Sequence, residues 1–141
     1  GQTPQAPPMK SVLAGKKLTP PIKGEAALEY TAPVVKREKD MVVTRITVRN
    51  AAIAPIPRLT IDQTWYDQSG AVVISSRGTV PGLLQPGEVQ TVVIETPYNA
   101  KLISNQYMFL HANGAVKPTR VPKTEVPNEP ATTPAPATKK P

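Results

Sequence analysis

The chain has 141 residues, no cysteine and a single histidine, His111. The lack of cysteine excludes disulfides, thiolate zinc sites, iron–sulfur clusters and a cysteine nucleophile. A single imidazole also excludes a metal site built on two histidines and a two-histidine proton relay. No apolar run is long enough to cross a membrane as a helix. These absences remove most metal and redox chemistry from the functions that the chain could perform.

Aromatic residues are few as well, whereas proline is abundant and unevenly placed. All six aromatic residues lie between positions 30 and 109, while 12 of the 18 prolines lie in residues 1–28 and 118–141. Such ends carry too little apolar surface to offset the entropy of ordering them. The composition therefore predicts a flexible basic arm over 1–25, one folded domain over 26–119 and a disordered Pro/Thr/Ala/Lys tail over 120–141.

The central part alternates between apolar and polar residues with the period of a β-strand. Residues 41–50 place Val42, Thr44, Ile46 and Val48 on one face, and residues 59–66 do the same with Leu59, Ile61, Gln63 and Trp65. Further β-rich runs lie before these segments at 26–35 and after them at 71–76, 88–96 and 104–112. Short strands separated by turn signals predict an antiparallel β-sandwich of about seven strands, of the immunoglobulin or fibronectin-III kind.

Three turns carry recognisable chemistry. Asp67 and Gly70 occupy the first and last positions of Asp67–Gly70, which favours a type I turn with Asp67 capping its own backbone. Pro86 and Gly87 at the centre of Gln85–Glu88 favour type II, because that turn needs a positive φ at its third residue. Asn113-Gly114 between two β-rich runs predicts a two-residue type I′ hairpin.

A family resemblance emerges from these positions. The motifs that carry it are Asn50, Leu59-x-Ile61, Trp65-Tyr66-Asp67-x-x-Gly70-x-Val72-Val73 and Leu84-x-Pro86-Gly87-Glu88. In this order they resemble the FxLYD domain over roughly residues 40–112. The chain departs from that pattern at Gln63, where the family favours Phe, and at Trp65, where it favours Leu. The resemblance implies a small extracytoplasmic β-sandwich, periplasmic or extracellular, with no catalytic residues.

Candidate chemical groups are sparse, and each has a structural interpretation. His111 is expected to be a hydrogen-bonded histidine at a strand end. Met108 and His111 are three apart, so a strand directs them to opposite faces and disfavours a copper site. Asp62 and Asp67 also lie on opposite faces. We therefore predict no catalytic, cofactor or metal residues, and assign structural roles to Trp65, Tyr66, Asp67, Gly70, Pro86 and Gly87.

The formal net charge of +7 lies mostly outside the predicted domain. Residues 29–117 hold nine basic and seven acidic residues, a net of +2, so the two flanks supply the other +5. The alternating signs of residues 36–40 favour a solvated turn. No nucleic-acid-binding motif is present. The flanking lysines are the candidate contacts to an anionic surface; they are Lys10, Lys16, Lys17, Lys139 and Lys140.

Three functions remain open from the sequence. The leading hypothesis is a non-enzymatic accessory module that contacts a protein or cell-envelope component through a sheet edge or end loops. The second is a structural subunit of a surface or envelope assembly, whose arms order on neighbouring copies. The third is a small-ligand or metal carrier. The sequence identifies neither the partner nor the oligomeric state.

Overall fold

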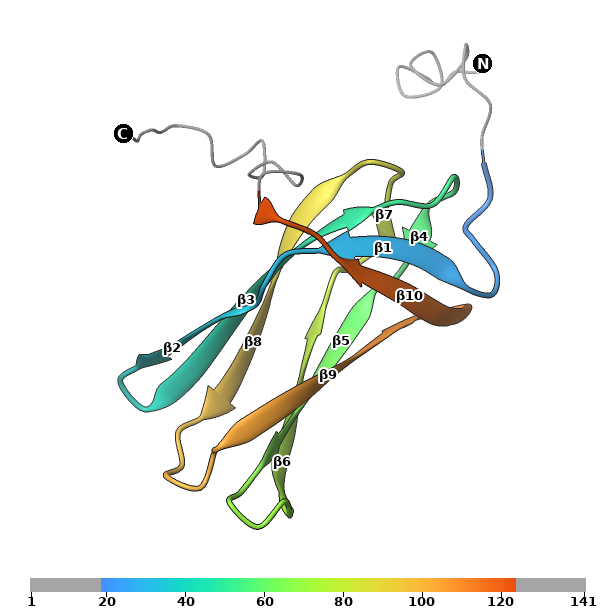
Figure 1. Ribbon diagram of the computed structural model, residues 1–141. Helices are drawn as coiled ribbons and strands as arrows, with labels where there is room; N and C mark the ends of the chain where they lie inside the picture. The colour runs from blue at the N-terminus through green and yellow to red at the C-terminus, as the bar shows by residue number, and fades with distance from the viewer. Residues whose placement is uncertain (1–18, 124–141) are drawn as a thin grey trace, which may run out of the picture.

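The computed structural model describes residues 19–123, which form an all-β structure without an α-helix in that range (Figure 1). The strands are β1 (Ala26–Tyr30), β2 (Val34–Glu38), β3 (Met41–Asn50), β4 (Ile56–Pro57), β5 (Thr60–Tyr66), β6 (Val72–Thr79), β7 (Leu83–Leu84), β8 (Val89–Pro97), β9 (Ser104–His111) and β10 (Gly114–Arg120). The predicted flexible arm and tail fall mainly on residues 1–18 and 124–141, outside the described residues.

Eight strands form one curled sheet, and β4 and β7 pair in a small second sheet. The order is β2-β3-β1-β10-β9-β5-β6, and β8 pairs with β3 along residues 41–49. On its other edge, β3 pairs first with β2 and then with β1. The result is a half-barrel, broadly like a β-sandwich, in which β8, β3 and β2 face β9, β5 and β6 (Figure 1).

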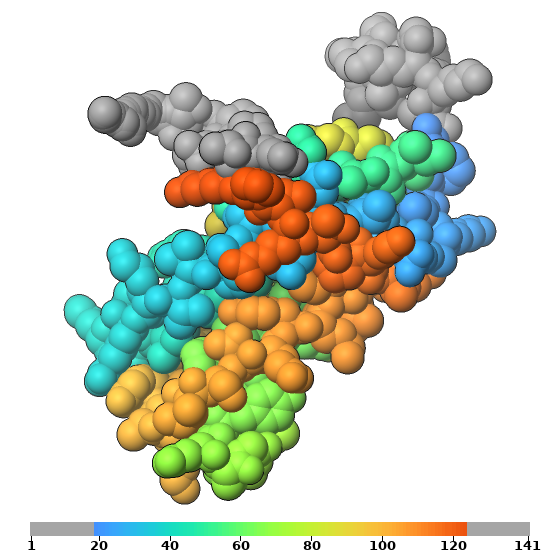
Figure 2. Space-filling model, in the orientation of Figure 1, coloured from blue at the N-terminus to red at the C-terminus, as the bar shows by residue number. Residues whose placement is uncertain are grey.

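Strand β10 joins the two layers. It pairs in parallel with β1 over residues 116–120, but with β9 only at Gly114↔His111 and Ala115↔Leu110. After Ala115 it therefore leaves the β9 layer and joins the β1 layer. Its red C-terminal end lies beside the blue and cyan surface of β1 to β3 (Figure 2).

On the opposite side of the half-barrel, β6 approaches β8 without a shared ladder. A Cβ built on Gly78 would lie 2.7 Å from Val92 Cγ1 and 2.8 Å from the Val93 carbonyl oxygen. The Thr96 hydroxyl donates to Ser76 Oγ at 2.8 Å. Glycine at position 78 thus permits a backbone approach that any side chain would prevent.

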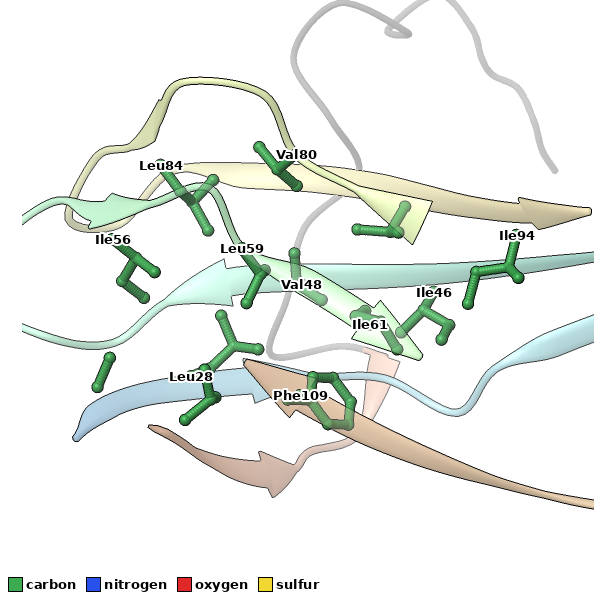
Figure 3. Close-up of a cluster of buried hydrophobic side chains, with 13 residues drawn as sticks. Leu28, Ile46, Val48, Ile56, Leu59, Ile61, Val80, Leu84, Ile94 and Phe109 are labelled. Carbon is green, nitrogen blue, oxygen red and sulfur yellow. The ribbon is translucent and has the colours of Figure 1, made fainter. Parts of the chain in front are cut away.

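The interior follows the predicted alternation of β3 and β5. Val42, Ile46 and Val48 are buried, as are Ile61 and Trp65. The main apolar cluster draws its side chains from both layers and from β4 and β7 (Figure 3); its fully buried members include Leu28, Ile46, Val48, Ile56, Leu59, Ile61, Leu84 and Ile94. Trp65 is only 6 % exposed but lies outside this cluster.

Asn50 closes β3 with a fully satisfied buried side chain. Its Nδ2 donates to the carbonyl oxygens of Ala54 and Leu84 at 2.9 and 2.8 Å, and its Oδ1 accepts from the Ala52 N–H. These bonds tie the β3–β4 connection to β7. A buried amide with such partners specifies the local backbone, because any other side chain would leave these groups unpaired.

Two predicted turns have the expected hydrogen bonds. The Gly70 N–H donates to the Asp67 carbonyl at 3.0 Å, and Asp67 Oδ1 accepts from the N–H groups of Ser69 and Ala71. In the second turn, the Glu88 N–H donates to the Gln85 carbonyl at 2.9 Å and Gly87 has φ +81°. The hydrogen bonds of both turns therefore agree with those predicted from their residue types.

Three local predictions are wrong. The run 26–35 is divided into β1 and β2, because the chain bends at 31–33, where Pro33 lacks an N–H. Residues 36–38 of the charged cluster continue β2, and only Lys39 and Asp40 form the turn. The β9–β10 hairpin turns at residues 112–113 rather than at Asn113-Gly114.

The hairpin differs from type I′ for a tertiary reason. Type I′ needs positive φ at both central residues, whereas the non-glycine positive φ angles of the described chain occur only at Lys39 and Arg58. The Asn113 carbonyl accepts from the Gly24 N–H at 3.0 Å, and the Asn113 side chain donates to the Ile22 carbonyl. The segment before β1 therefore holds this loop, and the folded contacts reach back to Ile22.

Candidate functional site

Among residues 19–123, the departure of β10 leaves the outer edge of β9 without a neighbouring strand. Residues 104–110 of β9 pair with β5 on one side, and only residues 110 and 111 pair with β10 on the other. Over residues 104–109, half of the backbone N–H and C=O groups therefore lack a strand partner in the described part of the chain. A row of unpaired backbone groups is a template for another extended chain.

The side chains of this edge do nothing to block such pairing. The sequence Ser104–Phe109 contains no charged residue and no proline. Met108 is 59 % exposed on the outer face, and Tyr107 is half-buried toward the interior. A flexible thioether and an aromatic ring provide adaptable contact surface to a partner.

Polar groups lie in the interior next to the Tyr107 hydroxyl. Gln63 is fully buried, and its Nε2 donates to Thr44 Oγ1 at 3.0 Å and to the Tyr107 hydroxyl oxygen at 3.2 Å. Burial raises the pKa of the Tyr107 phenol, while the hydrogen bond with Gln63 acts in the opposite direction. Within the described residues, Gln63 Oε1 and Trp65 Nε1 are buried without a hydrogen-bond partner. The interior beside the open edge is thus incompletely satisfied.

The predicted structural residues separate into two groups. Tyr66, Asp67 and Gly70 lie at the end of β5 that adjoins the start of β9, where the Ile103 N–H donates to the Tyr66 carbonyl. The Tyr66 hydroxyl donates to Gln106 Oε1 on β9 at 3.1 Å. Pro86 and Gly87 lie at the other end of the domain, where the Gly87 N–H donates to the Asn50 carbonyl.

The Asp67 turn borders a shallow depression of about 330 Å³ that Lys101 and Ile103 also line. Hydrogen bonds from Ser69 and Ala71 lower the pKa of the Asp67 carboxyl. Asp67 Oδ1 accepts three hydrogen bonds from its own turn, so this carboxylate oxygen stabilises the local structure.

His111 is hydrogen-bonded at the end of β9. Its Nε2 lies 2.6 Å from the Gly24 carbonyl oxygen, and its Nδ1 accepts from the Asn113 N–H. These bonds correspond to the neutral tautomer with the proton on Nε2. Met108 is on the outer face, away from His111. The Asp62 carboxylate is paired with Arg77, whose Nε donates to Asp62 Oδ1 at 2.7 Å.

Residues 19–123 contain no group of three or more His, Cys, Asp or Glu side chains arranged to hold a metal ion. The same residues include no helix of the length and apolar character needed to cross a membrane. The predicted electrostatic contacts Lys10, Lys16, Lys17, Lys139 and Lys140 lie outside the described residues.

Little in the sequence indicates the open edge of β9. Alternation predicts a strand over residues 104–112, but nothing local in this run shows where β10 turns away. The one usable signal was its lack of charge, in contrast to residues 36–40. Edge strands of natural proteins are commonly protected by charged residues.

No family model and no curated protein matches the sequence. A solved structure of IrmA from Escherichia coli is similar with a TM-score of 0.49 and 8 % sequence identity, over 66 % of this chain and 91 % of that chain.

Proposed function

We propose that this chain is a non-enzymatic binding module that adds an extended segment of a partner protein to its sheet at the outer edge of β9. The observation that carries the proposal is the run Ser104–Phe109, which pairs on one side only and has no charged or proline residue. Its six residues match the usual length of a strand. Strand addition obtains affinity from main-chain hydrogen bonds and specificity from alternate side chains.

Three other strands at the margins of the main sheet are less suitable. Strand β2 pairs only with β3, but three of its five residues are Lys36, Arg37 and Glu38. The outer strands β6 and β8 approach each other at Gly78, so neither offers a free path to an incoming chain. A partner segment is therefore expected at β9, with uncharged residues that contact Met108 and Tyr107.

We also propose that the half-barrel is an immunoglobulin-like sandwich of the FxLYD kind that acts outside the cytoplasm. The pairings β3–β8 and β5–β9, with β1 parallel to β10, support this assignment. Asn50 and the Asp67–Gly70 turn, on which the resemblance rests, have structural roles that such a family would retain. The extracytoplasmic location comes from the resemblance alone.

Selection of peptides on the full-length chain tests the binding proposal. The probe is a displayed library of random peptides of about ten residues, the upper end of ordinary strand length. Met108→Lys should weaken the binding of selected peptides about tenfold or more, because a charge at this position blocks the edge. Each factor of ten in affinity corresponds to about 1.4 kcal/mol of binding free energy.

Val34→Lys is the matched control. Val34 on β2 is 55 % exposed, close to the 59 % of Met108, so both substitutions add the same charge to an exposed strand position. The control should change affinity less than about twofold, the range of an exposed charge. Equal losses in both variants, or peptides that bind with undiminished affinity to Met108→Lys, would contradict the proposal.

A further inference from the structure

A second recess lies on the outer face of the opposite layer. It has a volume of about 740 Å³, within the range of small-molecule sites. One wall comes from β2, β3 and β8, and the other from residues 120–123 as they continue from β10. We call this recess the outer groove. It does not include any residue of β9.

The outer groove is lined by cations from both walls. Lys36 and Arg45 lie on the sheet, whereas Arg120 and Lys123 lie on the crossing segment, and no carboxylate of residues 19–123 lines the groove. Arg45 Nη1 is paired with Glu38 at 3.1 Å. The other three cations form no ion pair with any residue between 19 and 123. A concave surface with one sign of charge concentrates ions of the opposite sign.

Hydroxyl groups also line the outer groove. Thr47 on β3 faces Thr91 on β8, with 3.3 Å between their Oγ1 atoms. Thr31 also lines the groove. A threonine hydroxyl is both a donor and an acceptor, so each can orient an oxygen-rich ligand. Apolar contact surface comes from Val34 and Pro122.

We propose that the outer groove binds a small polyanion, a molecule with two or more phosphate or carboxylate groups on a compact skeleton. We assign this ligand two anionic groups because the cations stand on two walls of the groove. Lys36 and Arg45 would hold one group, Arg120 and Lys123 the other, and the threonine hydroxyls would donate to oxygens between them. This site is additional to the β9 edge, and neither proposal depends on the other.

Calorimetric titration of the full-length chain tests the groove, with tripolyphosphate and citrate as probes at constant ionic strength. Substitution of Lys36→Gln together with Arg120→Gln removes one cation from each wall. This variant should weaken binding about tenfold or more, because hydrogen bonds to charged groups contribute about 1.5–3 kcal/mol each. Failure of both probes to bind at about millimolar concentration, a standard free energy near −4 kcal/mol, would overturn the proposal.

The basic flanks need their own control, since they also attract anions. Lys139→Gln together with Lys140→Gln removes the same charge from the C-terminal tail and should change affinity less than about twofold. An equal loss in the two double variants would show diffuse attraction and overturn the site. Binding of tripolyphosphate alone assigns phosphate as the recognised group, binding of citrate alone assigns carboxylate, and either supports the groove.

Removal of hydroxyls without loss of charge gives an independent test. Thr47→Val and Thr91→Val keep the side-chain shape at exposed-face positions. Each should weaken binding severalfold, because a hydrogen bond is worth about 1 kcal/mol. Amide resonances of residues 45–47, 91, 120, 121 and 123 should shift during the titration. Shifts confined to other residues would overturn the assignment.

Discussion

The interior of the domain has an apolar half and a polar half, and the two differ in the packing and hydrogen bonding of their side chains. The apolar half is the main cluster around Ile46, Leu59 and Ile61, where β10 lies between β1 and β9. The polar half begins at the next inward-facing residue of each strand. On β3 this residue is Thr44, two positions before Ile46, and on β5 it is Gln63, two positions after Ile61. There β10 has left β9, and the edge is open.

If the proposed function holds, this difference separates the part of the domain that supplies stability from the part that recognises a partner. Well-packed aliphatic side chains supply most of the free energy of folding, and they are concentrated in the apolar half. The polar half contributes less, because Gln63 Oε1 and Trp65 Nε1 are buried without partners among the described residues. Its open edge is instead available to another chain. A partner could therefore bind the polar half without disturbing the packing that holds the domain together.

The largest expected effect comes from truncating the apolar half. Ile61 is fully buried in the main cluster. Ile61→Ala should lower the free energy of unfolding by about 2–5 kcal/mol, because it removes buried methylene groups and leaves a cavity. Urea titration measures this change. A loss below about 1 kcal/mol, typical of a surface position, would show that the apolar half is not the source of stability.

The next effect concerns the contact between β6 and β8. Gly78→Ala places a Cβ 2.7 Å from Val92 Cγ1 and 2.8 Å from the Val93 carbonyl oxygen, so the strands must separate. The expected cost is about 1–3 kcal/mol, the usual range for overpacking. Gly82→Ala is a useful comparison, because a Cβ there meets nothing within 4 Å and only the positive φ opposes it. Thermal melts of both variants show whether steric contact dominates.

These contacts mark the limit of what the sequence could predict. Alternation along β3 and β5 identified the buried faces, and the Asp67 and Gln85 turns followed from their residue types. Strand order was beyond local inference, because the parallel pairing of β1 with β10 joins residues 26–30 to 116–120. The outer groove was missed for the same reason: its cations at 36, 45, 120 and 123 are distant in sequence. The turn predicted at Asn113-Gly114 is wrong because residues 22 and 24 hold this loop by hydrogen bonds to Asn113.

A smaller effect is expected inside the polar half. Gln63→Leu removes the buried, unpartnered Oε1 and fills a similar volume, but deprives Thr44 and Tyr107 of a donor. The gain and the loss should nearly cancel, leaving a change of less than about 1 kcal/mol. Comparison with Ile61→Ala, one inner position away, sharpens the contrast between the halves. A loss as large as that of Ile61→Ala would show that the polar network is a main source of stability.

The smallest effect should come from the Asp67 turn. Hydrogen bonds from Ser69 and Ala71 lower the pKa of this carboxyl below its ordinary value of 3.8. A depressed folded-state pKa gives stability that is present above the unfolded value and is lost as pH falls through the folded one. Asp67→Asn should therefore flatten the fall in melting temperature below about pH 4. An unchanged pH profile would show that the carboxylate contributes nothing to the turn.

Amide hydrogen exchange of the full-length chain tests the central claim, the open edge of β9, most directly. Strand β5 pairs on both sides over residues 60–66, whereas β9 pairs on one side over residues 104–109. We expect slow exchange throughout β5, and in β9 an alternation of slow and fast amides, because every second N–H points to the unpaired edge. Uniformly slow exchange over residues 104–109 would show that the edge is already covered and would contradict the account.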